Sequence, residues 1–260
     1  MSQPVRVNFV DEGPREAPAV VFAHAVGTSL AMWAPQSAAL SGEFRVIRYD
    51  HRGHGASPVP PGPYRIEDLG RDLVGLLDLL DLERASVCGL SLGAMVGLWI
   101  AEHEPARVDR LVGCCVVARP ASPQAWADRA AKVRRDGIAA IADLVVERWG
   151  YTGRDARIER IVREALLATP AEGYAACCDA IERLDLEPDL ARVRAPTLLV
   201  AGDDDPAAPA AEADRLAAAI PGARVRIVQG AAHLANIERP GEVTAAIAEH
   251  LGPILTEARA

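Results

Sequence analysis

The chain alternates short apolar runs with segments of helical periodicity, and this alternation constrains the fold more than any other feature. Residues 19–23 (AVVFA) form an unbroken apolar run, which is typical of a strand buried on both faces of a sheet. Residues 66–82 repeat apolar side chains at every third or fourth position, which predicts a helix. Further strands are predicted at residues 5–10, 45–49, 85–89, 108–115, 197–202 and 225–228, and further helices at residues 92–104, 210–219 and 241–251. This order predicts an α/β fold with a mostly parallel sheet flanked by helices.

The alternation is interrupted once, in the middle of the chain. Residues 122–192 have helical periodicity, and glycines and prolines divide them into about four short helices with no predicted strand. We therefore predict a core of residues 1–120 and 190–260 and an inserted helical cap of residues 121–189. Ligands of open parallel sheets bind beyond the carboxyl ends of strands, so this insertion is expected to cover a pocket. The alternative is a decoration that faces only solvent.

Composition excludes several classes of protein. Of the 260 residues, 50% are hydrophobic and 25% are charged, which is typical of a globular chain that can bury a core without disulfides or metals. The net charge is −8 and no basic run is present, so nucleic acid and anionic membranes are not expected partners. No apolar stretch is long enough to predict a membrane span, and the first residues do not resemble a signal peptide.

The five cysteines predict a reducing environment. Their number is odd, four of them are adjacent in pairs, and no CxxC spacing suits zinc or redox chemistry. We therefore expect free thiols, a cytoplasmic location, no metal and no organic cofactor. The sequence leaves open whether the chain forms a homo-oligomer.

The segment Gly89-Leu90-Ser91-Leu92-Gly93 carries the clearest chemical signal. This G-x-S-x-G follows a predicted strand and precedes a predicted helix, which is the context of a nucleophile elbow. The turn would expose the Ser91 hydroxyl at the amino end of a helix, where developing negative charge is favoured. The alternative is an ordinary Gly-Ser turn between a strand and a helix.

A serine hydroxyl needs a general base, and the base needs an acid. His233 follows a late strand, where the order Ser, Asp, His puts the base, and it is the candidate among six histidines. The acid is expected after the strand that ends near Gly202, where Asp203, Asp204 and Asp205 are adjacent. Spacing alone does not choose among these three aspartates.

Backbone N–H groups should hold the oxyanion that forms during acyl transfer. One donor is expected from Leu92, directly after the nucleophile, and the other from the loop after the strand at residues 19–23. Val26 is the candidate donor in that loop, and we interpret His24 beside it as a structural residue that shapes the loop.

The whole chain resembles an α/β-hydrolase and, more specifically, the 3-oxoadipate enol-lactonases, which act in the breakdown of aromatic compounds. The similar segments are VGTSLAMW (26–33), YDHRGHGAS (49–57), GPYRIEDLGRDL (62–73), GLSLG (89–93), ERWG (147–150), TPAEGYAACCDAI (169–181), APTLLVAGDDDPAAPA (195–210) and AAHLANIE (231–238). The resemblance implies an α/β-hydrolase fold and makes Asp205, three residues after Gly202, the acid. The chain departs from the family at GCCVV (113–117) and GYTG (150–153), which are both expected beside the pocket.

The resemblance also implies a small substrate that carries a carboxylate. Burial of that charge without a partner would be costly, so an arginine in or beside the cap is expected to bind it. The candidates are Arg119 and Arg148, with Trp126 and Trp149 as walls of the pocket. The alternative for each is a solvated surface pair or simple packing.

These observations predict a serine hydrolase that opens a small lactone or ester through an acyl-enzyme. The resemblance implies 3-oxoadipate enol-lactone as substrate, and a small molecule as the only partner. One alternative is an esterase, a carbon–carbon bond hydrolase or a tailoring enzyme of secondary metabolism on the same fold. The other is a non-catalytic protein that binds a small molecule on a hydrolase scaffold.

Overall fold

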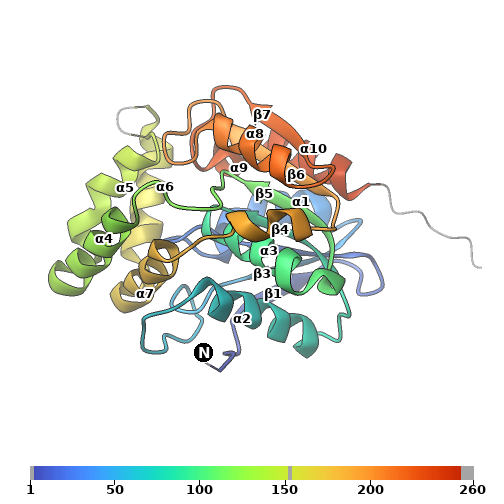
Figure 1. The fold of residues 1–260 in the computed structure, drawn as a ribbon, viewed down its shortest axis with the longest axis horizontal. Helices are drawn as coiled ribbons and strands as arrows, with labels where there is room; N and C mark the ends of the chain where they lie inside the picture. Colours follow the sequence, from blue (N-terminus) through green and yellow to red (C-terminus); the bar gives the residue numbers. More distant parts are fainter. Residues whose placement is uncertain (1–2, 152–153, 253–260) are drawn as a thin grey trace, which may run out of the picture.

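In the computed structural model, which describes residues 3–151 and 154–252, seven strands form one sheet (Figure 1). They are β1 (Phe9–Glu12), β2 (Ala19–Ala23), β3 (Arg45–Tyr49), β4 (Ala85–Leu90), β5 (Val108–Cys114), β6 (Thr197–Gly202) and β7 (Arg224–Val228). Their order in the sheet is β1-β3-β2-β4-β5-β6-β7. The β1–β3 pair is antiparallel and all the other neighbouring pairs are parallel, which confirms the predicted α/β fold.

The first strand begins later than the alternation of residues 5–10 predicts. Before Phe9, the Asn8 carbonyl still accepts from the Asp50 N–H just past β3, but two N–H groups of this segment bond to side chains. The Val5 N–H donates to Asp72 Oδ1 and the Asn8 N–H to Ser57 Oγ, each at 2.8 Å. A period-two pattern shows which side chains are buried, but it does not show which partner satisfies the backbone.

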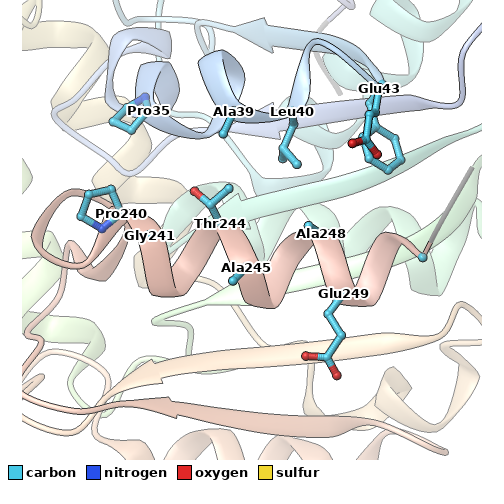
Figure 2. A pocket seen from close by; sticks show the side chains of 12 residues that line it. Pro35, Ala39, Leu40, Glu43, Pro240, Gly241, Thr244, Ala245, Ala248 and Glu249 are labelled. Carbon is cyan, nitrogen blue, oxygen red and sulfur yellow. The ribbon is translucent and has the colours of Figure 1, made fainter.

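The direction of each crossover determines which face of the sheet its helix covers. The chain crosses from β2 to β3 through α1 (Ala34–Leu40) and returns to β4 through α2 (Ile66–Leu79), in the opposite direction along the sheet. Because such crossovers are right-handed, α1 and α2 lie on opposite faces, and α3 (Leu92–His103) and α8 (Ala210–Ala219) share the face of α2. On the other face, α10 (Pro240–Leu251) lies beside α1 across an apolar groove (Figure 2).

Between β5 and β6 the described chain forms four α-helices and no strand. They are α4 (Pro123–Asp136), α5 (Ala142–Arg148), α6 (Ala156–Leu167) and α7 (Ala171–Glu182). Figure 1 shows them grouped together to the left of the sheet. Their packing on one another buries a second set of apolar side chains, which includes Val133, Val145, Ile158 and Val162. No helix within residues 3–151 and 154–252 is long and apolar enough to cross a membrane.

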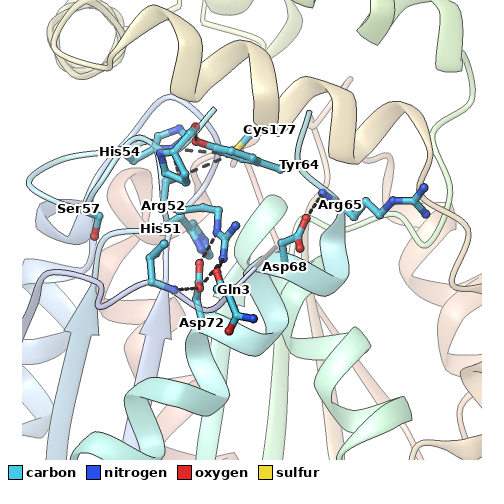
Figure 3. A network of polar contacts seen from close by, with 12 residues as sticks. Gln3, His51, Arg52, His54, Ser57, Tyr64, Arg65, Asp68, Asp72 and Cys177 are labelled. Carbon is cyan, nitrogen blue, oxygen red and sulfur yellow. Dashed lines mark hydrogen bonds and ion pairs between the residues drawn. The ribbon is translucent and has the colours of Figure 1, made fainter. Parts of the chain in front are cut away.

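A buried ion pair anchors the loop that follows β3 (Figure 3). The Arg52 guanidinium donates to both carboxylate oxygens of Asp72, at 2.5 and 2.6 Å, and both side chains are almost fully excluded from solvent. Asp72 belongs to α2, so the pair ties the loop to a helix of the core. The bidentate geometry satisfies two buried charges and holds His54, two residues further on, close to the carboxyl ends of the strands.

Candidate active site

The candidate site lies where the strand order reverses. The chain leaves β2 toward β3 on one side, and β4 pairs with β2 on the other side. In open α/β sheets, ligands bind beyond the carboxyl ends of strands at such a point. Residues 24–28 follow β2, and Ser91 follows β4, so this reversal brings the predicted oxyanion loop next to the predicted nucleophile.

Ser91 occupies a sharp turn between β4 and α3. Its φ of 53° and ψ of −114° form a conformation that residues other than glycine rarely adopt. The Ser91 N–H donates to the Cys114 carbonyl of the neighbouring strand at 2.9 Å. A Cβ at Gly89 would collide with the Gly93 backbone, and a Cβ at Gly93 would collide with the Ala23 backbone. The turn therefore depends on both glycines of the motif.

His233 and Asp205 are in direct contact. The His233 Nδ1 lies 2.8 Å from Asp205 Oδ2, and the two residues are both only 3% exposed. The other carboxylate oxygen, Asp205 Oδ1, accepts from the Ala207 and Ala208 N–H groups at 2.8 and 3.1 Å. Burial by itself would raise the pKa of Asp205, but the charge and hydrogen bond of His233 and the two backbone amides together lower it. An ionised Asp205 that accepts from Nδ1–H leaves Nε2 as the acceptor nitrogen of the ring.

The other two aspartates of the run point elsewhere. The Asp203 carboxylate is exposed and accepts from the Ala231 N–H at 3.3 Å. The Asp204 carboxylate is exposed and pairs with Arg154 at 2.8 Å. Of the three adjacent aspartates, the structure therefore places only Asp205 beside the histidine.

Buried histidines hold the loop that carries Val26. The Gly27 N–H donates to His54 Nε2 at 2.9 Å, and His24 Nδ1 lies 2.7 Å from the Ala25 carbonyl. Burial lowers the pKa of His24 to about 4 and that of His54 to about 3, so both rings are neutral at pH 7. The structure thus gives His24 the structural position expected for it and adds His54, which the sequence did not single out.

Two backbone N–H groups at the site have no acceptor among the described residues. One belongs to Val26 and the other to Leu92, the first residue of α3. The first N–H groups of a helix have no partner within the helix, so the Leu92 amide is available to a ligand. Val26 and Leu92 are the two oxyanion donors that the sequence predicts.

A cavity of about 270 Å³ connects these groups with the inserted helices. The predicted site residues that line it are Val26, Ser91, Arg119, Trp126, Arg148, Trp149 and His233. A larger cavity of about 660 Å³ lies between α1 and α10 (Figure 2). Among the described residues, no serine, cysteine or histidine lines that groove, so it does not combine a nucleophile with a histidine base.

The arginines near the cavity differ in how well their charge is paired. Arg119 is more than half exposed and has Asp185 as an ion-pair partner at 3.8 Å. No carboxylate of the described residues pairs with Arg148 or Arg129. The Arg129 guanidinium lies 4.4 Å from the centroid of the Trp126 ring, and the Arg148 guanidinium lies 5.9 Å from it. Partial burial and the nearby charge of Arg129 lower the pKa of Arg148.

Arg129 is a residue that sequence reasoning missed. It is only 6% exposed, and its Nε has no hydrogen-bond partner. A buried, unpaired guanidinium nitrogen is rare because its desolvation is not compensated. Arg129 follows Trp126 by three residues in α4, so the helical period places both on one face, and this spacing was the signal available in the sequence.

The segment at residues 150–153, where the chain departs from the family pattern, touches the histidine loop. The Tyr151 hydroxyl accepts from the Leu234 N–H at 2.7 Å, and the His233 N–H donates to the Trp149 carbonyl at 3.4 Å. Thr152 and Gly153 lie outside the described residues. The end of α5 therefore supports the loop that positions His233.

The other departure, at residues 113–117, places a thiol at the site. Cys115 lines the cavity and is only 2% exposed. Its φ of 48° is again in the left-handed region. Cys115, Asp205 and His233 can each offer a ligand atom, and these atoms lie within 4.8 Å of one another. They form the one group of this kind found among the described residues.

Comparisons with known proteins identify the family to which this fold belongs. The model of the alpha/beta hydrolase fold family matches residues 18–240. The chain is 37% identical to 3-oxoadipate enol-lactonase 2 of Acinetobacter baylyi over 92% of this chain and 90% of that protein. It is 32% identical to the putative carbamate hydrolase RutD of a Caulobacter species, over 89% of this chain and 90% of that protein. The crystal structure of the enol-lactonase from Burkholderia xenovorans LB400 superposes with a TM-score of 0.90, at 42% identity over 94% of this chain and 96% of that chain.

Proposed function

The chain belongs to the α/β-hydrolase family and is a hydrolase, and we propose that it opens a small enol-lactone that carries a carboxylate, by a serine mechanism. The observation that carries the proposal is the contact between His233 and Asp205 in the same cavity as Ser91 on its sharp turn. The choice of an enol-lactone rests on the relatives that bear this name and on Arg148, which lines the cavity and forms no ion pair with a carboxylate of the described residues.

In the proposed reaction, Ser91 Oγ attacks the lactone carbonyl carbon while His233 Nε2 takes its proton. Asp205 holds the ring with Nδ1–H toward itself and stabilises the imidazolium that forms. The bond from the carbonyl carbon to the ring oxygen then breaks. The leaving group departs as an enol or enolate, which is a better leaving group than an alkoxide, and it receives the proton from His233.

Water then completes the cycle. His233 takes a proton from water, the hydroxide attacks the acyl carbon, and Ser91 regains its proton as the acid is released. The enol product becomes the 3-oxo acid by tautomerisation. In both half-reactions the Val26 and Leu92 N–H groups hold the oxyanion, and the Gly27–His54 hydrogen bond keeps the first donor in place.

We assign the substrate carboxylate to Arg148, which lines the cavity together with Trp126. Arg129 does not line the cavity, but it lies against the same tryptophan ring and adds a second positive charge near Arg148. Among the described residues, no carboxylate forms an ion pair with either arginine. Arg119, the other candidate, already has Asp185 as a partner and is more exposed. Under this proposal residues 121–189 act as a cap that provides the wall for the substrate and excludes water.

A carbamate is the second candidate substrate, because the putative carbamate hydrolases are also similar over most of the chain. The test is a turnover screen with a carboxylate-bearing enol-lactone, a simple carbamate and a neutral aryl ester. The proposal expects the enol-lactone to have the highest kcat/KM. A higher kcat/KM for the carbamate would replace it. Turnover of none of the three would favour a binding protein on this scaffold.

A further inference from the structure

The thiol of Cys115 faces the histidine and the carboxylate of the proposed catalytic site. Cys115 follows β5, Asp205 follows β6, and His233 follows β7, so three neighbouring strand ends bring the side chains together. Their potential ligand atoms all lie within 4.8 Å of one another, and each residue is at most 3% exposed. The hydrolytic steps use Asp205 and His233 and leave the thiol without a role.

The backbone at Cys115 is strained in a way that directs this side chain. A residue other than glycine in the left-handed region costs about 1 kcal/mol or more and persists where the surrounding structure imposes it. The Cys115 N–H donates to the Val200 carbonyl at 2.8 Å, which fixes the residue at the end of the strand. The thiol contacts the Ala232 carbonyl at 4.0 Å and also has backbone hydrogen bonds at Gly202 and Ala235. Its position beside Asp205 and His233 is therefore well defined.

Thiolate, imidazole and carboxylate are the ligand types that Zn²⁺ prefers in proteins. With metal–ligand bonds of roughly 2.0–2.3 Å, tetrahedral ligands lie about 3–4 Å apart. Atoms that already lie within 4.8 Å of one another can reach this spacing by small side-chain rotations. Cys115 and His233 both line the cavity, so a metal ion can enter and a fourth position stays open to water.

We propose that Cys115, Asp205 and His233 form a Zn²⁺ site and that bound Zn²⁺ inhibits the hydrolase. The inhibition rests on the proposed function, whereas the binding of the metal does not. With Zn²⁺ on one imidazole nitrogen and the remaining proton on the other, His233 has no lone pair to accept the Ser91 proton. The thiol must release its proton to solvent when it binds the metal, so binding strengthens as the pH rises.

The test starts from protein freed of metal with a chelator. Zn²⁺ is titrated into wild type, Cys115→Ser and Cys114→Ser, with binding measured by calorimetry and native mass spectrometry. Cys114 is the matched control, because it is adjacent and fully buried but interacts with Cys88 and not with the histidine. We expect one Zn²⁺ per chain in wild type and Cys114→Ser, and binding weakened at least ~10-fold in Cys115→Ser.

Turnover of a neutral aryl ester, followed in the same titration, reports the inhibition. Wild type should lose activity in proportion to bound Zn²⁺ and regain it with the chelator. Equal Zn²⁺ affinity in wild type and Cys115→Ser would overturn the proposed site. Zn²⁺ that binds through Cys115 without loss of turnover would overturn the inhibition. If no ester is hydrolysed at all, the proposed function fails while the binding result still decides the metal site. Circular dichroism and a second variant, Cys115→Ala, guard against a loss of binding caused by misfolding.

Discussion

The two walls of the cavity differ in how their charges are satisfied. On the core side, Asp205 is buried, and its two oxygens accept hydrogen bonds from His233 and from two backbone amides. On the side of the inserted helices, Arg129 does not itself line the cavity but is similarly buried against Trp126. Its Nη1 donates to the Tyr174 hydroxyl at 3.4 Å, yet its Nε has no partner and no carboxylate of the described residues forms an ion pair with it. Because the hydrogen bonds of Asp205 are made within the protein, it can assist the same chemistry with every substrate. A positive charge without an ion-pair partner instead favours a substrate that carries a carboxylate. We therefore expect some mutations to lower kcat for all substrates and others to change only the preference for a carboxylate.

The largest effect is expected from the core side. Ser91→Ala should fold normally and lose at least ~10³ in kcat for every substrate, because the nucleophile and its base act as a unit. Turnover of the enol-lactone and of a neutral aryl ester, each measured with protein of checked purity, tests this. Wild-type rates in the variant would remove the serine mechanism.

A smaller but still general loss is expected from Asp205→Asn. The amide cannot stabilise the imidazolium and permits the wrong tautomer of His233, so kcat should fall roughly 10²-fold or more. Asp203→Asn and Asp204→Asn are matched controls, since these exposed neighbours bond to Ala231 and Arg154 and not to the histidine. If Asp203→Asn were as damaging as Asp205→Asn, the acid would have to be reassigned.

Substitutions in the inserted helices should change selectivity more than reactivity. Arg148→Met should lower kcat/KM for the carboxylate-bearing lactone by roughly 10- to 150-fold, since a charge-assisted hydrogen bond contributes ~1.5–3 kcal/mol. Arg129→Met should lower it less, because Arg129 does not line the cavity and acts only through its charge. Turnover of the neutral ester should fall much less. Arg119→Met is the comparison variant, and its loss should be smaller because Asp185 already shares that charge. An equal loss on both substrates in all three variants would contradict the separation of the two walls.

The last effect concerns stability and not turnover, at the contact between the core and the end of the insertion. Both carboxylate oxygens of Glu102 are buried without a hydrogen bond, and burial, together with Asp189, raises its pKa to about 8 against the opposing charge of Arg192. The folded protein therefore retains a proton that the unfolded chain loses near pH 4.5. The contribution of this proton to the free energy of unfolding is fully present below pH 4.5. It is lost as the pH rises from 4.5 toward 8, by about 1.4 kcal/mol for each pH unit.

Glu102→Gln removes this titration. The free energy of unfolding, measured in urea at pH 6 and at pH 8.5, should fall more steeply with pH in wild type than in the variant. Glu104→Gln, at an exposed position two residues away, should behave like wild type. Parallel pH dependence in wild type and Glu102→Gln would show that Glu102 is ionised throughout.

Much of the fold could be predicted because local patterns report burial directly. The predicted strands at residues 19–23, 45–49 and 197–202 and the predicted helix at residues 210–219 have the observed bounds. The first strand was misplaced, because its apolar alternation continues into residues whose amides bond to Asp72 and Ser57. Side-chain partners from distant segments leave no local trace in the sequence.

The sequence by itself determined the order of strands and helices, the place of the insertion and the elbow at Ser91, because periodicity and close glycine packing are local properties. It also narrowed the acid to a run of three aspartates, among which the resemblance to the enol-lactonases selected Asp205. Only the tertiary structure brought Asp205 into contact with His233, buried the Arg129 Nε without a partner, and directed Cys115 toward both members of the pair. Each of these three arrangements brings together side chains from segments that are far apart in the sequence. Each also depends on the exclusion of water where those segments pack together.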